Sequence, residues 1–152
     1  MGDTDESSSQ IGGRVEAIQY PIFGACQCGK VTYELLAPPT MVVACHCKEC
    51  QKLSTSAFSI TAMVEASNLV FKGEMQFWSR PADSGNRSDA MFCPSCGNRI
   101  YHVNPDEPDK IKLKPSNLSD TRLIQPTAHV WLSEKQAWFQ VPDGVMQFDK
   151  QP

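Results

Sequence analysis

The sequence predicts a mainly β fold built from several small twisted sheets. Short runs along the chain alternate between apolar and polar residues, which is the periodicity of half-buried strands. Eleven prolines and nine glycines interrupt these runs and disfavour long helices. Seven cysteines lie in three tight clusters, which could hold small sheets together through metal ions.

The first expected strand, residues 30–35, is β-rich and stops before Pro38 and Pro39. One helical turn is expected at residues 47–53, within the second cysteine cluster. Further along, a run at residues 68–72 leads into a turn at Gly73, after which the alternation resumes. The complete set of expected strands is 30–35, 58–64, 68–72, 75–78, 99–103, 110–114, 128–132 and 137–141.

A chain of 152 residues suits a single domain, which we place at residues 15–152. Residues 1–14 are rich in serine, glycine and acidic residues, so we expect a disordered lead. No run approaches the ~18 apolar residues of a membrane span. Cations are scattered and the net charge is −3, so we expect neither nucleic acid nor membrane as a partner. The N-terminal stretch has no apolar core typical of a signal peptide, so we expect a cytoplasmic protein.

The cysteine clusters indicate metal binding rather than disulfides. Disulfides need an oxidising compartment, and partners in a Cys-x-Cys pair are too close for an unstrained bridge. Tetrahedral thiolate sites suit zinc, and an iron–sulfur cluster is the alternative. Seven thiols fit one closed four-thiolate site plus one three-thiolate site. The clusters are Cys26-x-Cys28, Cys45-His46-Cys47-x-x-Cys50 and Cys93-x-x-Cys96.

Two of the clusters have the spacing of metal-binding hooks. Cys93-x-x-Cys96 is followed by a glycine, which tolerates positive φ and frees backbone N–H groups to donate to sulfur. Cys26-x-Cys28 is a shorter hook of the same kind. Neither hook can close a tetrahedron alone, so we expect a joint structural zinc site made of Cys26, Cys28, Cys93 and Cys96, contributing on the order of 10 kcal/mol to folding.

The remaining thiols, Cys45, Cys47 and Cys50, are the expected ligands of a second, catalytic zinc. Nothing local supplies a fourth ligand, and an open position is where water or a substrate thiol can lose its proton. The alternative is a purely structural site closed by His46 or His102. His46 lies between two ligands, so its ring should point away from a metal that they share. His102 and His129 lie in apolar runs, where a core histidine is the ordinary interpretation.

These motifs resemble the glutathione-dependent formaldehyde-activating enzyme family, which is also called the centromere-protein-V-like family. The matching segments are GACQCGKV at 24–31, CHCKECQ at 45–51, FCPSCG at 92–97, PTAHVW at 126–131 and QFDK at 147–150. The resemblance implies a β-tent fold of several small coiled antiparallel sheets. It also implies the same division of the seven cysteines between a structural and a working zinc.

The resemblance implies condensation of formaldehyde with glutathione to S-hydroxymethylglutathione, which is carbon–sulfur lyase chemistry. We therefore expect a zinc-dependent lyase or synthase that acts on a small thiol and a small aldehyde. A non-catalytic glutathione carrier and a zinc-stabilised interaction module are the alternatives, and a homo-oligomer is left open. Glu49 could move a proton beside the site. Four further side chains could contact a ligand, namely Gln51, Ser54, Ser56 and Arg87.

Overall fold

The computed structural model describes residues 17–81 and 85–152, and in this part of the chain it is mainly β. The expected lead at residues 1–14 lies outside the described residues, and a single domain at 15–152 stays a prediction. The strands are β1 Ile22–Ala25, β2 Thr32–Leu35, β3 Met41–Cys45, β4 Ser59–Glu65, β5 Leu69–Lys72, β6 Gln76–Pro81, β7 Arg87–Phe92, β8 Arg99–Val103, β9 Lys110–Leu113, β10 Ala128–Val130 and β11 Met146–Gln147. The α-helix is α1 Lys48–Ser54, and short 3₁₀ turns lie at Ala66–Asn68, Pro115–Asn117, Arg122–Ile124 and Leu132–Glu134.

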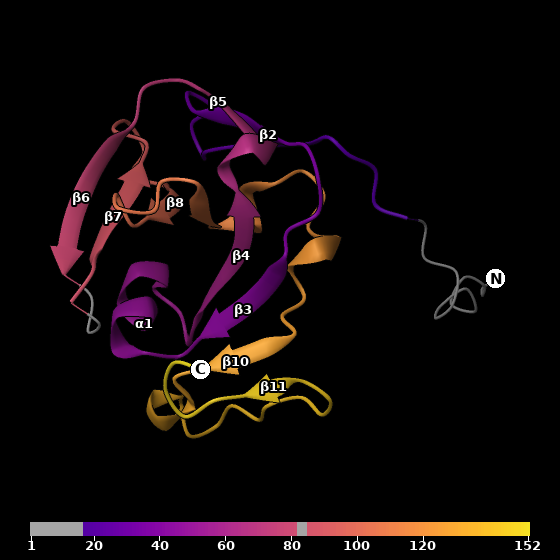
Figure 1. Ribbon diagram of the computed structural model, residues 1–152, viewed down its shortest axis with the longest axis vertical. Coiled ribbons are helices and arrows are strands. Elements are labelled where there is room, and N and C mark those ends of the chain that lie inside the picture. Colours follow the sequence, from indigo (N-terminus) through magenta and orange to yellow (C-terminus); the bar gives the residue numbers. More distant parts are fainter. Residues whose placement is uncertain (1–16, 82–84) are drawn as a thin grey trace.

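The strands form two sheets, which confirms the mainly β class (Figure 1). A small antiparallel sheet has the order β1-β2-β5, and a larger one has the order β11-β10-β3-β4-β9-β8-β7-β6. The expectation of antiparallel sheets fails at β10, which pairs in parallel with both β3 and β11. Parallel neighbours need a connection of about a dozen residues or more, and the long segments between these strands provide it.

Seven of the eight expected runs contain strands, and the eighth does not. Residues 137–141 form a loop in which Trp138 is 69% exposed, so this segment does not bury an apolar face as a strand of the sheet would. The expected strand at 128–132 ends at Val130, because Trp131 adopts a left-handed conformation with φ 56°. Alternation did not reveal β1, β3, β7 or β11; β3 is a continuous apolar run, which is typical of a buried strand.

The core lies between the two sheets and includes two of the cysteines. Its largest fully buried side chains include Tyr33, Leu35, Ile100 and Leu113, which come from β2, β8 and β9. Cys26 and Cys93 belong to the same apolar cluster. The predicted turn after β5 is confirmed at Gly73, whose φ of +104° and a backbone atom 2.2 Å from a would-be Cβ both require glycine.

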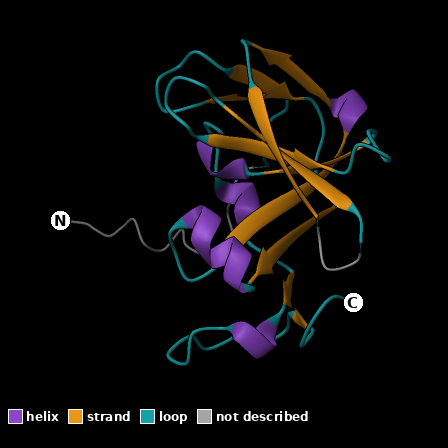
Figure 2. Ribbon diagram, turned by 90° about the vertical axis from the view of Figure 1, so that its left-hand side faces the viewer, coloured by secondary structure: helices purple, strands orange, loops and turns teal. Residues whose placement is uncertain are grey.

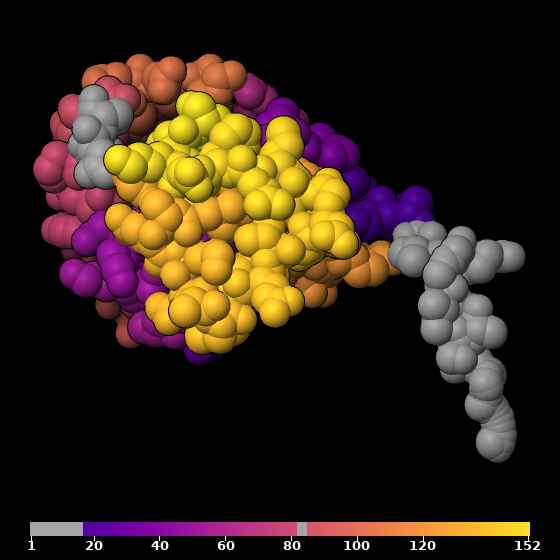
Figure 3. All heavy atoms as spheres, turned by 90° about the horizontal axis from the view of Figure 1, so that it is seen from below, coloured from indigo at the N-terminus to yellow at the C-terminus, as the bar shows by residue number. Residues whose placement is uncertain are grey.

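Helix α1 and the C-terminal segment lie at the same end of the larger sheet, beside the end of β3 (Figure 1). Figure 2, turned by 90° about the vertical axis, shows the same helix beside strands of the larger sheet and below the smaller sheet. From below, the C-terminal residues cover a broad face of the molecule (Figure 3). Backbone bonds from Leu132 N to Phe148 O and from Ser133 N to Asp149 O fasten this segment. In the described residues, no helix is long and apolar enough to span a bilayer.

Candidate metal centres

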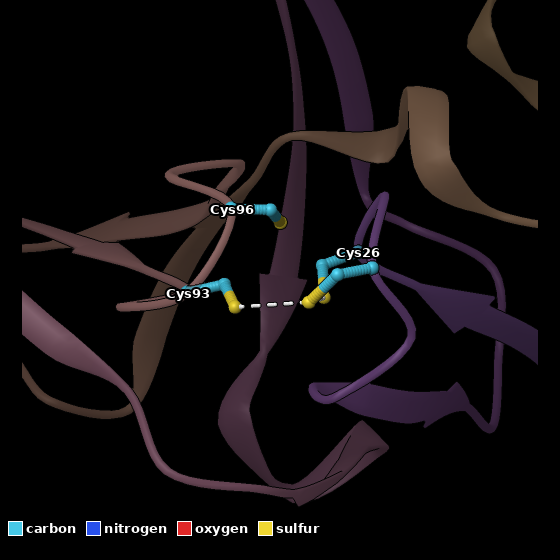
Figure 4. A group of neighbouring side chains, drawn as sticks. Cys26, Cys93 and Cys96 are labelled. Atoms are coloured by element: carbon cyan, nitrogen blue, oxygen red, sulfur yellow. Dashed lines mark hydrogen bonds between the residues drawn. The ribbon is translucent and has the colours of Figure 1, made fainter.

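Two hairpin turns bring four cysteines together, as the hook motifs predict. Cys26 follows β1 and Cys28 lies in the turn to β2, while Cys93 follows β7 and Cys96 lies in the turn to β8. Figure 4 shows the sulfur atoms of the two turns directed toward one another. The glycine after each hook has a positive φ, +81° at Gly29 and +78° at Gly97. Other residues rarely adopt this conformation, which explains the glycine at both positions.

The geometry of this four-cysteine group fits one tetrahedral zinc ion. All four Sγ atoms lie within 4.8 Å of one another. Cys28 Sγ is 3.6 Å from both Cys26 Sγ and Cys93 Sγ, so the described cysteines are free rather than bridged. A zinc tetrahedron with bonds of about 2.3 Å to sulfur has S–S edges of about 3.8 Å, close to these separations.

Hydrogen bonds between the two turns hold their four thiols close together. The Gln27 N–H donates to Asn98 Oδ1 over 3.2 Å, and Lys30 Nζ donates to Ser95 Oγ over 3.2 Å. The Val31 N–H donates to Cys26 Sγ over 3.3 Å. Burial alone would disfavour the Cys26 thiolate, but this bond and the neighbouring thiols outweigh it and lower its pKa to about 6.

The second group consists of Cys45, Cys47 and Cys50, whose Sγ atoms also lie within 4.8 Å of one another. Cys45 is the last residue of β3, and Cys47 is the N-cap of α1, where its Sγ accepts from the Cys50 N–H over 3.4 Å. A strand end followed at once by a helix start thus turns three thiols toward one point. All three residues are only partly buried, so the group is not sealed inside the core.

The three thiols of this group cannot all carry a negative charge together unless a cation compensates it. Hydrogen bonds from Cys45 and Cys50 hold the pKa of Cys47 down to about 2. The pKa of Cys45 is raised, first by its hydrogen bonds to Cys47 and Cys50 and then by burial. Because only one of the three thiols ionises readily by itself, a metal ion is what would allow all three to be thiolates together.

Neither histidine proposed as a fourth ligand belongs to this group. The His46 side chain is fully buried, and its ring packs against those of Phe58 and Phe139, with centroids 4.9 and 5.0 Å away. Its Nε2 is 2.9 Å from Nδ1 of His129. His102 Nε2 is 3.0 Å from Arg99 Nη1. The ring of His46 therefore points into the protein interior, away from the three thiols. His102 and His129 are core histidines, as expected.

The other candidate ligand-binding residues are engaged elsewhere. Gln51 Nε2 donates to the carbonyls of His46 and Glu134, so this side chain braces the metal loop. Ser54 Oγ donates to the Cys50 carbonyl over 2.7 Å. The exposed Glu49 forms an ion pair with Lys52 at 3.7 Å, and Arg87 pairs with Asp89 at 3.4 Å. None of the four is joined to a thiol of the three-cysteine group by a hydrogen bond.

An open hollow of about 510 Å³ lies along the side of α1. The helix contributes Cys50 to the three-cysteine group and Lys48, Gln51 and Lys52 to the wall of the hollow. The exposed Trp138 also lines the hollow, together with Ser56 and Gln136. The metal group and the hollow thus share one short helix.

Sequence reasoning missed one residue near the three-cysteine group. Lys114 follows β9, and its Nζ donates to Ser59 Oγ over 3.0 Å and to Thr61 Oγ1 over 2.7 Å. Burial lowers the pKa of its ammonium group, and the charges of Cys50 and Cys45 oppose that shift. The alternation in residues 110–114 placed this lysine on the exposed side of a strand, so the sequence carried no signal for it.

A mainly β protein with two cysteine groups suited to holding metal ions is therefore the class that fold and sites define. Residues 21–134, more than half of the chain, match the family described as glutathione-dependent formaldehyde-activating enzyme, and the chain belongs to that family. No curated protein matches it. A crystal structure of a Rhodobacter sphaeroides protein is similar in fold, with a TM-score of 0.50 and 22% identity over 64% of this chain and 87% of that one.

Proposed function

We propose that the protein is a zinc-dependent carbon–sulfur lyase or synthase that joins a small thiol, of the glutathione class, to a small aldehyde such as formaldehyde. The family supports a formaldehyde-activating or related function. The observation that carries the proposal is the contrast between the two cysteine groups. One offers four thiols, whereas the other offers three, with no histidine or carboxylate beside them in the described residues.

Zinc held by Cys45, Cys47 and Cys50 would supply a Lewis acid with a fourth position for an incoming sulfur. In the forward direction the substrate sulfur forms a bond to the aldehyde carbon. The carbonyl π pair moves to oxygen, which takes a proton from water to give the S-hydroxymethyl adduct. In reverse, the hydroxyl loses its proton, the carbon–sulfur bond breaks, and the thiolate leaves.

The protein contributes position and charge to this reaction. Gln51 braces the metal loop through two backbone carbonyls, so the three thiols stay gathered. Lys48 and Lys52, along the hollow beside α1, suit the carboxylates of an acidic thiol. Free cysteines of this number also fit a reducing compartment such as the cytoplasm.

A thiol carrier is the second candidate, because one observation favours it. Within residues 17–81 and 85–152, no histidine or carboxylate is grouped with the three thiols to move a proton. A site that only binds the thiol would need none.

The test measures zinc content and the rate of S-hydroxymethylglutathione formation for wild type and Cys47→Ser, against a reaction without protein. We expect two zinc ions per wild-type chain, a rate that rises with protein concentration, and a folded variant with one zinc and no acceleration. Two zinc ions with glutathione binding but no acceleration would favour the carrier. An unfolded Cys47→Ser variant would make the second site structural and would favour an interaction module.

A further inference from the structure

Lys114 is a half-buried cation without a carboxylate partner in the described part of the chain. Its Nζ is held by two hydroxyl groups, those of Ser59 and Thr61, which are neutral. None of the ion pairs between described residues includes it. Both hydroxyl partners are buried, and a charge held among buried groups is costly unless an opposite charge compensates it, so the position of Lys114 requires an explanation.

The groups whose negative charge would act on Lys114, once a metal ion holds them as thiolates, are Cys50 and Cys45 of the three-cysteine group. Attraction to Cys50 and Cys45 favours its charged form, whereas Arg99 and Lys112 repel it. The reciprocal attraction acts on Cys50. The electrostatic surroundings of this lysine therefore tie it to the three-cysteine group.

Strand pairing places the ammonium group on the same side of the sheet as Cys45. In the antiparallel pair of β3 and β4, Ser59 lies directly opposite Cys45. Directly opposed residues project from the same face of a sheet. Since Nζ of Lys114 is 3.0 Å from the Ser59 hydroxyl, the lysine is anchored to the cross-strand neighbour of a thiol.

The charge balance of the group explains what this lysine does. A divalent ion with three thiolates has a net charge of −1, and a bound substrate thiolate makes it −2. We propose that Lys114 is the charge partner of the three-cysteine metal site, stabilising the anionic metal–thiolate group and the further negative charge of an incoming thiolate. The inference rests on the metal site of the proposed function. It makes Lys114 a positioning residue rather than a metal ligand.

The test compares Lys114→Met with Lys112→Met, a control that removes the same charge from an exposed position nearby on β9. Zinc affinity is measured by competition with a chelator, and Co²⁺ absorption reports the thiolate ligands of each site. We expect the first metal to bind all three proteins alike. The second metal should bind Lys114→Met at least about tenfold more weakly, which is about 1.4 kcal/mol, and Lys112→Met within about twofold of wild type.

A second variant, Lys114→Arg, keeps the charge and should recover most of the second-metal affinity. Equal second-metal affinity in wild type and Lys114→Met would overturn the inference and leave the proposed function standing. A wild-type protein that binds only one metal would overturn both. A third variant, Lys114→Gln, replaces the charge with a polar side chain. Weakened binding of both metals, or loss of folding in Lys114→Met and Lys114→Gln alike, would show a structural lysine and also overturn the inference.

Discussion

The imidazole Nε2 of His46 lies 2.9 Å from Nδ1 of His129, and this contact joins the metal-binding loop to β10. His46 sits between two thiols of the three-cysteine group, and His129 lies opposite Ala44 in the parallel pair of β10 and β3. The His46 N–H also donates to the Val130 carbonyl over 3.0 Å. Strand β10 therefore holds the loop that presents the three thiols.

The His46–His129 contact should contribute to stability. In the described residues His46 Nδ1 has no hydrogen-bond partner, so His129→Phe would leave both ring nitrogens of a fully buried side chain without one. We expect the free energy of unfolding to fall by about 1–3 kcal/mol, as measured by urea denaturation. Trp138→Leu, which changes an exposed neighbouring aromatic, should stay within about 0.5 kcal/mol of wild type. A His129→Phe protein as stable as wild type would contradict the assignment.

The two metal groups should differ sharply in their effect on stability. Cys93 is fully buried in the core, and its group ties the β1–β2 turn to the β7–β8 turn, so Cys93→Ser should lose one metal and unfold at a much lower temperature. Cys50→Ser should lose one metal and keep most of the stability, because its group joins only residues 45–50. Thermal unfolding with metal analysis checks both. Equal losses of stability in the two variants would argue against one structural and one working site.

The hollow beside α1 can be tested through its exposed Lys48. If an acidic thiol binds there, Lys48→Gln should raise KM for glutathione about two- to fivefold and leave kcat unchanged, since one exposed ion pair contributes at most about 1 kcal/mol. The same change at Lys112, away from the hollow, is the control. The effect on KM should shrink as salt is added. An unchanged, salt-independent KM would mean that the thiol binds elsewhere.

Much of the metal chemistry could be predicted from local spacing. Cys-x-Cys and Cys-x-x-Cys pairs turn their thiols to one side within a few residues, so short-range geometry is enough to indicate each hook. The joining of Cys26 with Cys93 also followed, because neither hook can complete a tetrahedron alone. The alternation of apolar and polar residues located most of the strands, because it is also a local signal: it marks a strand with one buried and one exposed face.

Contacts between residues far apart in the chain could not be predicted from local spacing and alternation. The His46–His129 contact spans 83 residues and depends on a parallel pairing that neither strand signals in its own sequence. Lys114 looked like an exposed strand lysine, yet β9 ends at Leu113 and the side chain turns toward Ser59. Residues 137–141 alternate like a strand, but they pair with no strand in the described residues, and Phe139 instead packs on His46.

Stability should fall with acid through His102, a buried histidine of β8. Burial, and then the charges of Lys114, Arg99, Arg80 and Lys112, lower its pKa from 6.5 to about 2. The guanidinium of Arg99 can only donate, so His102 Nε2 must accept and stay unprotonated in the folded protein. Between the two pKa values the unfolded state binds the extra proton, so stability is complete above about pH 6.5 and is lost as the pH falls below it.

His102→Gln isolates this effect, because its amide oxygen can still accept from Arg99 but does not titrate. Protonation of the thiols lowers the stability of both proteins alike, so the difference between them reports on the histidine. From about pH 7 to about pH 5, wild type should lose about 2 kcal/mol more than His102→Gln in urea unfolding, at up to about 1.4 kcal/mol per pH unit. Parallel pH profiles for the two proteins would show that His102 takes up a proton without cost in the folded state, in conflict with its buried, cation-facing position.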